Sequence, residues 1–530
     1  MKINRKKDLW KYREARSMKN LDRFILLVLV IAGIISLVRF ADWWFRKEHI
    51  GNFWLFVVLS TFFWYSMSRV ILSWINYLNI KKPEAVPPPE GLNVAIFTTS
   101  YAGEPLAMIE KTLQACQLVS YPHTTYLLDN TGDPAFKEMA ERNGTVWIDS
   151  NGLEGAKAGK INNALKLTKE DFILVLDPDH IVFPNFLDKT LGYFQDEKIG
   201  FVQVSQAYYN QYRSFTAKGA AEQTYAFYGP TQMGLNGLGC SVAIGANCTF
   251  RRKALESIGG HAIGLAEDLL TSIRLHSAGW KSVYNPVVAS RGLVPEDFGS
   301  FCKQQLKWAR GVFEIMFVEI PKVFRKLTGW QKFSYLAIGT YYMVGLISFF
   351  FTVLPFLFFL TGILPAHMPF VDFVIHGSYL IIISILIYFW VQKWLCHPAT
   401  ESGFHWRGMI LKYACWPVYF FGFILAVANV DIPYIPTPKR AMVGYITPFA
   451  RPLIICIFLF IITVVMVIIN RRYFVPESEL IASSEKTWGM MGFAFIAFVM
   501  SLFGVMAALS SRRLKNEDPW DKISLNNIKI

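Results

Sequence analysis

Long apolar stretches stand on both sides of a central segment in which apolar and polar residues alternate over short distances. Six of these stretches are close to or above the length that crosses the apolar core of a bilayer. They are residues 24–45, 53–77, 333–364, 377–395, 453–469 and 488–509. The pattern therefore predicts two transmembrane helices before the central segment and four after it.

The central segment, residues 92–332, contains short runs of branched apolar residues separated by amphipathic stretches. This alternation predicts strands and helices in turn, and therefore a Rossmann-like α/β domain. The predicted strands are residues 94–100, 124–128, 145–149, 172–176 and 201–205. Residues 81–91, KKPEAVPPPEG, are rich in proline and predict a stiff linker at the start of the domain.

Residues 409–430 are apolar but contain a lysine and a proline, so this stretch could either cross the membrane or lie flat on it. If it crosses, Lys439, Arg440 and the basic residues at 512–515 fall outside the cell. If it lies in the interface, they fall on the same side as residues 1–23, which hold nine Lys or Arg against three acids. Because basic residues favour the cytoplasmic side, we predict an interfacial helix and six spans.

These patterns predict a multi-pass protein of the cell (inner) membrane with its α/β domain and both termini in the cytoplasm. The predicted order is a basic segment (1–23), two transmembrane helices (24–80), the linker (81–91), the α/β domain with interfacial helices (92–332), two transmembrane helices (333–395), an interfacial helix (404–430), a loop (431–450), two transmembrane helices (451–510) and a polar cytoplasmic tail (511–530).

Composition supports the membrane assignment and limits the kinds of ligand that the protein is expected to bind. Of 530 residues, 53% are hydrophobic and only 17% are charged, which leaves too much apolar surface for a water-soluble protein. The net charge of +14 indicates contact with anionic lipids and anionic ligands. No arginine-rich groove with interleaved aromatics indicates a nucleic acid. The seven cysteines lack metal-site spacing and predict reduced, buried residues. A basic run before the first apolar stretch argues against a cleavable signal.

The most informative short stretch is FILVLDPDHIVFP, residues 172–184. Five apolar residues predict a strand buried on both faces, and Asp177, Pro178 and Asp179 follow at its carboxyl end. Ligands bind at this edge of an open α/β sheet, and two carboxylates there can hold a divalent cation against a diphosphate. The alternative is a simple turn, because Asp-Pro-Asp is common turn chemistry.

Other polar residues follow predicted strands or lie in loops of the same domain. SYAGEP follows the first strand, Asp129 ends the second, and Lys157 lies in the glycine-flanked GAKAGK. Each alone could be a helix cap or a solvated side chain. Together with Asp177 and Asp179, they predict an edge of the sheet that suits a nucleoside diphosphate and its metal.

Two further groups lie late in the domain. Glu267 and Asp268 open a predicted amphipathic helix, where an acidic pair could also be explained by the helix dipole. Gln304 and Trp308 in QQLKW are four residues apart and share a helix face, which could present a stacking platform and an amide to a sugar. The alternative for QQLKW is an ordinary amphipathic interfacial helix.

The order SYAGEP, LLDN, AKAGK, DPD, AED and QQLKW between membrane spans resembles the processive family 2 glycosyltransferases, and most closely the bacterial cellulose synthase catalytic subunits, over residues 24–510. The resemblance implies a GT-A fold that uses Mg²⁺ or Mn²⁺ and a UDP-sugar. It also implies a growing polysaccharide chain as acceptor and a β-glucan (cellulose, β-1,3 or mixed-linkage) made from UDP-glucose and moved across the membrane.

The same resemblance implies roles for individual residues on the donor side. Asp177 and Asp179 match the D-x-D metal ligands, and Asp179 is the more direct one. The residues implied to bind the nucleotide are Tyr101, Glu104, Asp129, Lys157, Asp177, Gln304, Gln305, Thr437 and Lys439. Thr437 and Lys439 belong to YIPTPK, which resembles the gating loop of the family, here within residues 431–450.

On the acceptor side, Asp268 matches the general base, with Glu267 beside it. Lys307 and Trp308 match the end of Q-R-x-R-W, whose Trp stacks under the acceptor sugar. Gly245 and Asn247 occupy the loop that lines the acceptor site in the family.

Departures from the family pattern leave the product open. Lys307 and Gln305 stand where arginines are usual, Asn130 stands for a second Asp, and the loop around Gly245 lacks the Phe-Phe-Cys-Gly run. Another β-linked polysaccharide from an N-acetylglucosamine or mannose donor, and a non-processive enzyme that glycosylates a lipid carrier, are the alternatives. A transporter or scaffold with an inert domain would not need these carboxylates. The short stretch after Leu509 is too small for a cyclic-di-GMP-binding barrel, and accessory subunits are further partners that the sequence does not identify.

Overall fold

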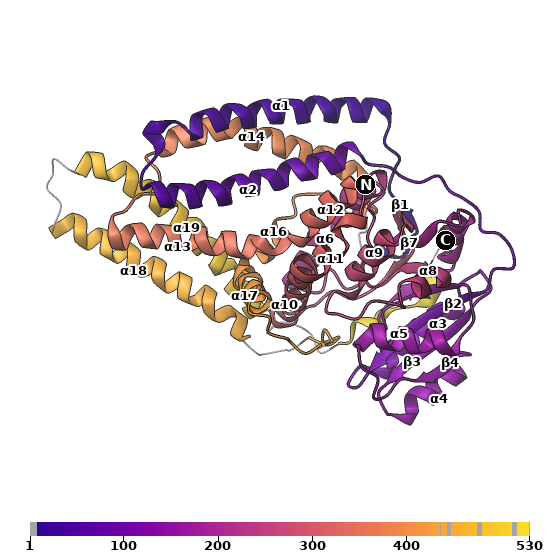
Figure 1. Ribbon diagram of the computed structural model, residues 1–530. Helices are drawn as coiled ribbons and strands as arrows, with labels where there is room; N and C mark the ends of the chain where they lie inside the picture. Colours follow the sequence, from indigo (N-terminus) through magenta and orange to yellow (C-terminus); the bar gives the residue numbers. More distant parts are fainter. Residues whose placement is uncertain (1–7, 435, 442–446, 474–479, 511–516, 529–530) are drawn as a thin grey trace.

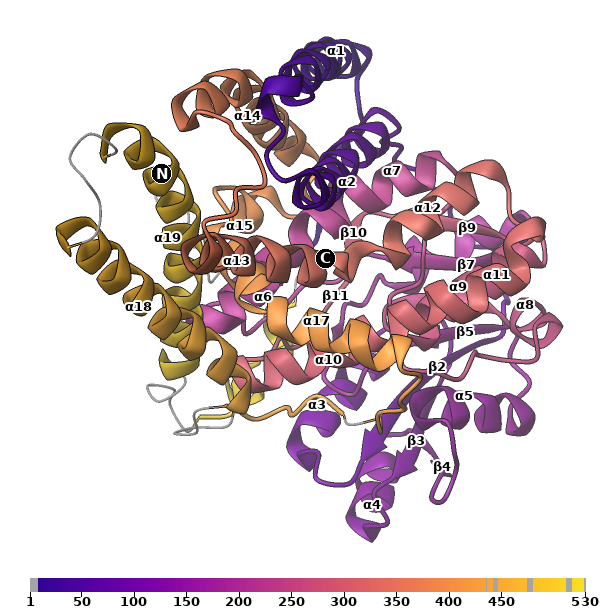
Figure 2. The ribbon, with the colours of Figure 1, turned by 60° about the vertical axis from the view of Figure 1, so that its left-hand side comes forward.

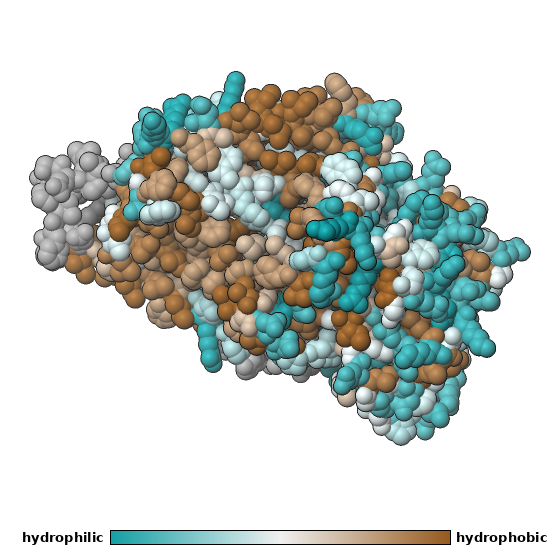
Figure 3. All heavy atoms as spheres, viewed as in Figure 1, coloured by the Kyte–Doolittle hydropathy of each residue, from teal (hydrophilic) through white to brown (hydrophobic). Residues whose placement is uncertain are grey.

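The structure, a computed structural model, describes residues 8–434, 436–441, 447–473, 480–510 and 517–528. Long helices run side by side on one side of the molecule, and an α/β domain lies on the other (Figure 1). The surface over the long helices is mainly hydrophobic, whereas the α/β domain carries most of the hydrophilic surface in the same view (Figure 3). This division agrees with the two kinds of sequence pattern.

The six predicted membrane spans are helices, and six described helical segments have the length and apolarity to cross a bilayer. They contain α1 (Asn20–Trp44), α2 (Phe53–Leu78), α13 (Val344–Thr361), α14 (Phe370–Val391), α18 (Arg451–Tyr473) and α19 (Leu480–Ser510). The fourth begins at Phe370, earlier than the predicted residue 377. The predicted span 333–364 corresponds to one helical segment, Gly329–Thr361, in which a 3-10 helix at Tyr341–Met343 joins α12 (Gly329–Gly339) to α13.

The α/β domain is built on a seven-stranded mixed sheet with the strand order β4-β3-β2-β5-β8-β7-β9. Its strands are β2 (Val94–Tyr101), β3 (Thr124–Asn130), β4 (Val146–Asp149), β5 (Phe172–Val175), β7 (Ile199–Val204), β8 (Cys248–Arg251) and β9 (Lys281–Asn285). All five predicted strands are confirmed. The strands β8 and β9 were not predicted, and β8 runs antiparallel to both of its neighbours.

The sheet is covered on both faces, which explains why its central strands are continuously apolar. Ile96 of β2 packs in one hydrophobic core and its neighbour Phe97 packs in another. The helices of the domain are α3 (Leu106–Gln117), α4 (Pro134–Arg142), α5 (Ala156–Leu167), α6 (Phe215–Ala226), α7 (Gln232–Gly237), α8 (Arg252–Ser257), α9 (Glu267–Ser277), α10 (Phe298–Glu314) and α11 (Ile320–Val323).

The ambiguous stretch forms two helices, α16 (Trp406–Ala414) and α17 (Trp416–Val427), after the short α15 (Pro398–Glu401). They meet at an angle of 44°, and the pair is apolar enough to count as a seventh span by composition. The prediction of a single helix over residues 404–430 was therefore wrong. The chain bends before Pro417, which lies in the first turn of α17. Figure 2 shows α17 beside α10 of the domain.

Segments outside the spans return to the α/β domain. The short strand β1 (Arg13–Glu14) pairs antiparallel with β10 (Val287–Val288). After the last span, Trp520 is only 1% exposed and lies in the same core as Leu113 and Ile181. The predicted polar tail therefore contains a residue that completes the domain.

Candidate active site

Asp177 and Asp179 lie immediately after β5, at the edge where β2 and β3 also end. The turn between them is fixed by the backbone N–H of His180, which donates to Asp177 O at 3.1 Å, and by Thr112 Oγ1, which donates to Pro178 O at 2.8 Å. Asp177, Asp179 and His180 each offer a ligand atom within 4.8 Å of the others. In the described part of the chain, no other group of this kind occurs. The turn interpretation is therefore confirmed, and the metal-site interpretation stays a prediction that this cluster of ligand atoms allows.

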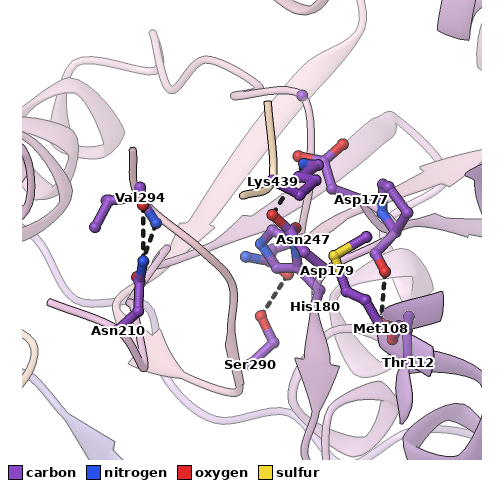
Figure 4. Close-up of polar contacts among 12 residues, drawn as sticks. Met108, Thr112, Asp177, Asp179, His180, Asn210, Asn247, Ser290, Val294 and Lys439 are labelled. Carbon is purple, nitrogen blue, oxygen red and sulfur yellow. Dashed lines mark hydrogen bonds and ion pairs between the residues drawn. The ribbon is translucent and has the colours of Figure 1, made fainter. Parts of the chain in front are cut away.

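Each of the two carboxylates has a lysine partner. Lys157 Nζ donates to Asp177 Oδ1, and Lys439 Nζ lies 3.0 Å from Asp179 Oδ2. His180 Nδ1 lies 2.9 Å from the other oxygen of Asp179. Burial acts to raise the pKa of Asp179, but Lys439 and His180 outweigh it and hold this pKa well below its usual range. Figure 4 shows Lys439, Asp179, His180 and Asn247 gathered at one place.

This donor set fits a hard divalent cation. Carboxylate oxygens are the ligands that Mg²⁺ and Mn²⁺ prefer, and both carboxylates here are in the ionised form that binding requires. The ammonium of Lys439 already supplies positive charge at Asp179. The negative charge of the two carboxylates can therefore be balanced by a cation, either a lysine ammonium or a metal ion.

Asp129 is buried beneath the loop that follows β2 and does not lie on the surface of the domain. It is 1% exposed and accepts hydrogen bonds from Ser100 Oγ at 2.6 Å, from Thr131 N at 3.0 Å and from Trp147 Nε1 at 3.1 Å. Its two oxygens therefore fix the ends of β2 and β3 in position.

The SYAGEP loop is held by a lysine that was not predicted as a site residue. Lys160 is fully buried, donates to Ser100 O at 2.7 Å, and places its amine 3.2 Å from the centre of the Tyr101 ring. The N–H of Tyr101 donates to Glu104 Oε2 at 3.0 Å. Burial raises the pKa of Glu104 to about 7 and lowers that of Lys160 to about 7. The available signal was the second lysine of GAKAGK, one helical turn after Lys157.

The loop that holds Gly245 and Asn247 lies between the metal site and α9. Both residues have positive φ, 81° and 58°, and Lys157 donates to Gly245 O. The Gln203 amide bonds to Ile244 N, Ala246 O and Asn247 O. Asn247 is 0% exposed and accepts from Ser290 Oγ at 2.5 Å, so it supports the loop from behind.

Glu267 and Asp268 open α9, and Asp268 lies against this loop. A Cβ placed on Gly245 would lie 3.4 Å from Asp268 Oδ2, which shows how closely the carboxylate approaches. Burial raises the pKa of Asp268, and burial together with Asp268 raises that of Glu267 to about 7. A carboxylate with a raised pKa is better suited to accept a proton near neutral pH.

The residues of QQLKW point in different directions on α10. Lys307 Nζ lies 4.4 Å from the centre of the Tyr434 ring, and Tyr434 stacks on Tyr101 at 6.1 Å. Gln305 is 4% exposed and accepts from Tyr419 of α17 at 3.3 Å, so it contacts α17 instead. Gln304 and Trp308 are half-buried, one turn apart.

The structure thus brings together most of the predicted residues. Lys157 and Lys439 link the metal site to the Gly245 loop and to the loop after α17. Thr437 is half-buried in the same loop, whereas Ile435 of the predicted YIPTPK lies outside the described residues. Gln305 is directed away from this group.

Two family models match the chain in this region. The model described as glycosyltransferase like family 2 matches residues 91–311, and the model described as cellulose synthase matches residues 256–516. The chain belongs to the family 2 glycosyltransferases. The α/β domain described above is therefore a GT-A glycosyltransferase domain.

Curated relatives of this glycosyltransferase include two cellulose synthase catalytic subunits, described as UDP-forming. The one from Komagataeibacter sucrofermentans is 28% identical over 63% of this chain and 46% of its own length. The one from Pseudomonas fluorescens is 26% identical over 72% of this chain and 53% of its own length. The chain therefore spans about half the length of the curated relatives it matches.

Among solved structures, the mannosyltransferase PcManGT from Pyrobaculum calidifontis, in complex with GDP-Man and Mn²⁺, is similar over 63% of this chain and 99% of its own length. Its TM-score is 0.46 at 16% sequence identity.

Proposed function

We propose that the protein is a membrane-embedded, processive, inverting glycosyltransferase that polymerises a β-glucan from UDP-glucose and moves it across the membrane. The observation that carries this proposal is the continuous arrangement from Lys439 through Asp179, Asp177, Lys157 and the Gly245 loop to the half-buried carboxylate of Asp268. It joins a site for a metal and a diphosphate to a proton acceptor.

In this proposal Asp177 and Asp179 hold Mg²⁺ or Mn²⁺. The bound cation would stabilise negative charge on the departing diphosphate. Lys157 and Lys439 add positive charge on either side of the same group. Tyr101, Glu104 and Asp129 shape the nucleotide end, with Thr437 and Gln304 at the margins of the site.

Asp268 acts on the acceptor. As the acceptor hydroxyl oxygen forms its bond to the anomeric carbon, Asp268 takes the hydroxyl proton, and the bond between that carbon and the UDP oxygen breaks. A single displacement of this kind inverts the anomeric centre. General-base help contributes on the order of 10² to 10⁴ in rate. Trp308 and Lys307 support the acceptor sugar, since aromatic faces stack on sugar rings.

The six apolar helices suit a path for the product through a bilayer, with the catalytic domain on the cytoplasmic side of the cell (inner) membrane. In this topology the bent α16–α17 pair lies in the interface, where α17 contacts α10 through Gly422 and Ala309. Partners are the UDP-sugar, the growing chain, the bilayer and accessory subunits.

A second candidate is the synthesis of another β-linked polysaccharide, from an N-acetylglucosamine or mannose donor. It is favoured by the composition of the Gly245–Asn247 loop, which lacks the aromatic pair typical of cellulose synthases.

The test uses purified full-length protein in lipid nanodiscs with radiolabelled UDP-glucose, UDP-N-acetylglucosamine and activated mannose. We expect insoluble labelled polymer from one donor. Label in a lipid fraction indicates the non-processive alternative, and absence of turnover with every donor contradicts the proposal.

The assignment of Asp268 as the general base is tested separately with a substitution at that residue. Asp268→Asn should leave UDP binding within about twofold and reduce polymer formation by about 10² to 10⁴. The matched control is Asp133→Asn at the exposed N-cap of α4, which should synthesise at the normal rate. Full synthesis by Asp268→Asn would show that another group is the base.

A further inference from the structure

We propose that the segment after the last span is a clamp that positions the loop carrying Lys439, through an ion pair between Arg440 and Asp518. The inference rests on the proposed function, in which Lys439 contacts the donor diphosphate. It concerns two described segments, residues 436–441 and 517–528, which come together although 78 residues separate the paired side chains.

The contact between the two segments has the geometry of a specific pair. Arg440 Nε lies 3.0 Å from Asp518 Oδ1, and Arg440 Nη2 lies 2.6 Å from Asp518 Oδ2. Such two-point contacts fix the orientation of the guanidinium as well as its position. The same guanidinium lies 5.7 Å from the centre of the Trp520 ring, where the aromatic face adds a cation–π attraction.

The segment that carries Asp518 is itself anchored. Trp520 and Ile523 are 1% and 5% exposed and lie in the core that covers one face of the sheet. Arg213 donates to Glu517 O immediately before Asp518. Asp518 is therefore held on both sides by groups that belong to the catalytic domain, so it can act as a fixed point.

The residue beside Arg440 reaches the catalytic site. Lys439 Nζ contacts Asp179 Oδ2 at 3.0 Å, and its side chain is only 17% exposed. Two consecutive side chains of the loop are thus fixed to opposite partners, one at the metal site and one at the clamp. Tyr434 adds a third contact by stacking on Tyr101.

In this arrangement the ion pair of Arg440 holds the backbone of the loop, while the side chain of Lys439 can still change its partner. The lysine stem has four carbons, so its amine can transfer from Asp179 to a diphosphate oxygen while Arg440 keeps the backbone in place. A loop that is already in place loses less conformational freedom when the donor binds. The clamp should therefore lower the KM for the UDP-sugar and leave kcat nearly unchanged.

The experiment compares wild type, Asp518→Ala and a matched control in full-length protein in nanodiscs. The first readout needs no substrate: trypsin cleaves after Lys439 or Arg440 only when the side chain is free to enter the protease. Because partly exposed ion pairs contribute modestly, we expect cleavage there to be about two- to fivefold faster in Asp518→Ala. The KM for the UDP-sugar should rise by a similar factor, with kcat changed less than twofold.

The matched control is Asp196→Ala, which breaks an ion pair with Lys281 of 3.2 Å at the opposite edge of the sheet. It should match wild type in both readouts. The charge-reversed pair, Arg440→Asp with Asp518→Arg, should restore the KM, which a purely structural defect of the tail would not do.

Unchanged cleavage in Asp518→Ala would overturn the clamp. Faster cleavage with an unchanged or lower KM would overturn its positioning role. The cleavage comparison does not depend on turnover. If the wild-type protein used no UDP-sugar, the proposed function would fail while the clamp could still be judged.

Discussion

The ion pair between Lys439 and Asp179 predicts competition between the lysine and a divalent cation for the same carboxylate. The variant Lys439→Met keeps much of the apolar stem and removes the charge. In wild type, a cation that binds Asp179 without nucleotide must first displace the amine, which lies 3.0 Å from Oδ2. In the variant this step is absent, so the cation should bind more tightly.

The expected change in cation affinity follows from the strength of the contact between Lys439 and Asp179. At this separation the Coulomb attraction is about 5 kcal/mol for an effective dielectric constant of about 20, before desolvation is subtracted. Both side chains are largely buried, at 17% and 5% exposure, so desolvation offsets much of this attraction. A hydrogen bond to a charged group retains about 1.5–3 kcal/mol. The variant should therefore bind the cation about 10- to 100-fold more tightly.

The assay is a titration of nucleotide-free protein with Mn²⁺, followed by electron paramagnetic resonance. Lys307→Met is the matched control: its amine lies over the Tyr434 ring, 4.4 Å from the ring centre, so the change should be several times smaller. With Mn²⁺ present, Lys439→Met should bind UDP more weakly, because the diphosphate loses a cation. Mn²⁺ affinity that is equal to or weaker than wild type in Lys439→Met would refute the reasoning.

Three further predictions concern other parts of the site. Glu267 has a pKa raised to about 7, so its contribution to stability is lost as the pH rises from about 4.5 to 7; Glu267→Gln should melt at a higher temperature than wild type at pH 8 but not at pH 4. Asp129→Asn places an amide against three donors and should cost about 1–3 kcal/mol in folding free energy while raising the KM for the UDP-sugar. Gly292→Ala would place a Cβ 2.5 Å from His180 Cε1, so the ring must shift from its present contact with Asp179, and Mn²⁺ affinity should fall about 10- to 100-fold.

Each of these has a control of the same chemistry. Glu138→Gln is exposed on α4 and should melt like wild type at both pH values. Asp133→Asn alters a helix cap without a link to the nucleotide loop, so the KM should not change. Gly329→Ala meets no atom within 4 Å and should bind Mn²⁺ normally. An effect in a control equal to that in its partner would contradict the assigned role.

The parts of the fold that could be predicted from sequence are those in which one local pattern decides the structure. Six long apolar stretches predicted six helices, and the apolar run before Asp177 predicted β5 and the edge at which it ends. The strands β8 and β9 were missed because CTFR and KSVYN are short and mix charged with apolar residues. Their pairing is decided by neighbours far away in the chain.

Prediction of the site from the sequence is limited in the same way, because only local patterns can be recognised. Motif order located both aspartates and Asp268, because each follows a recognisable strand or opens a helix. The pairing of Lys439 with Asp179 links residues 260 positions apart, and no local pattern encodes it. The core position of Trp520 was missed because a single tryptophan in a polar stretch has no periodicity to indicate burial.

The pairing of β1 with β10 has a consequence for how the protein is made. Residues 13–14 leave the ribosome first but find their partner strand only after residue 288 has been synthesised. Trp520 can reach the core of the sheet only after the sixth apolar helix has been synthesised. The catalytic domain therefore completes its packing only after all six apolar helices have been synthesised. In the proposed function, this order would complete the helices that carry the product before the catalytic domain finishes packing.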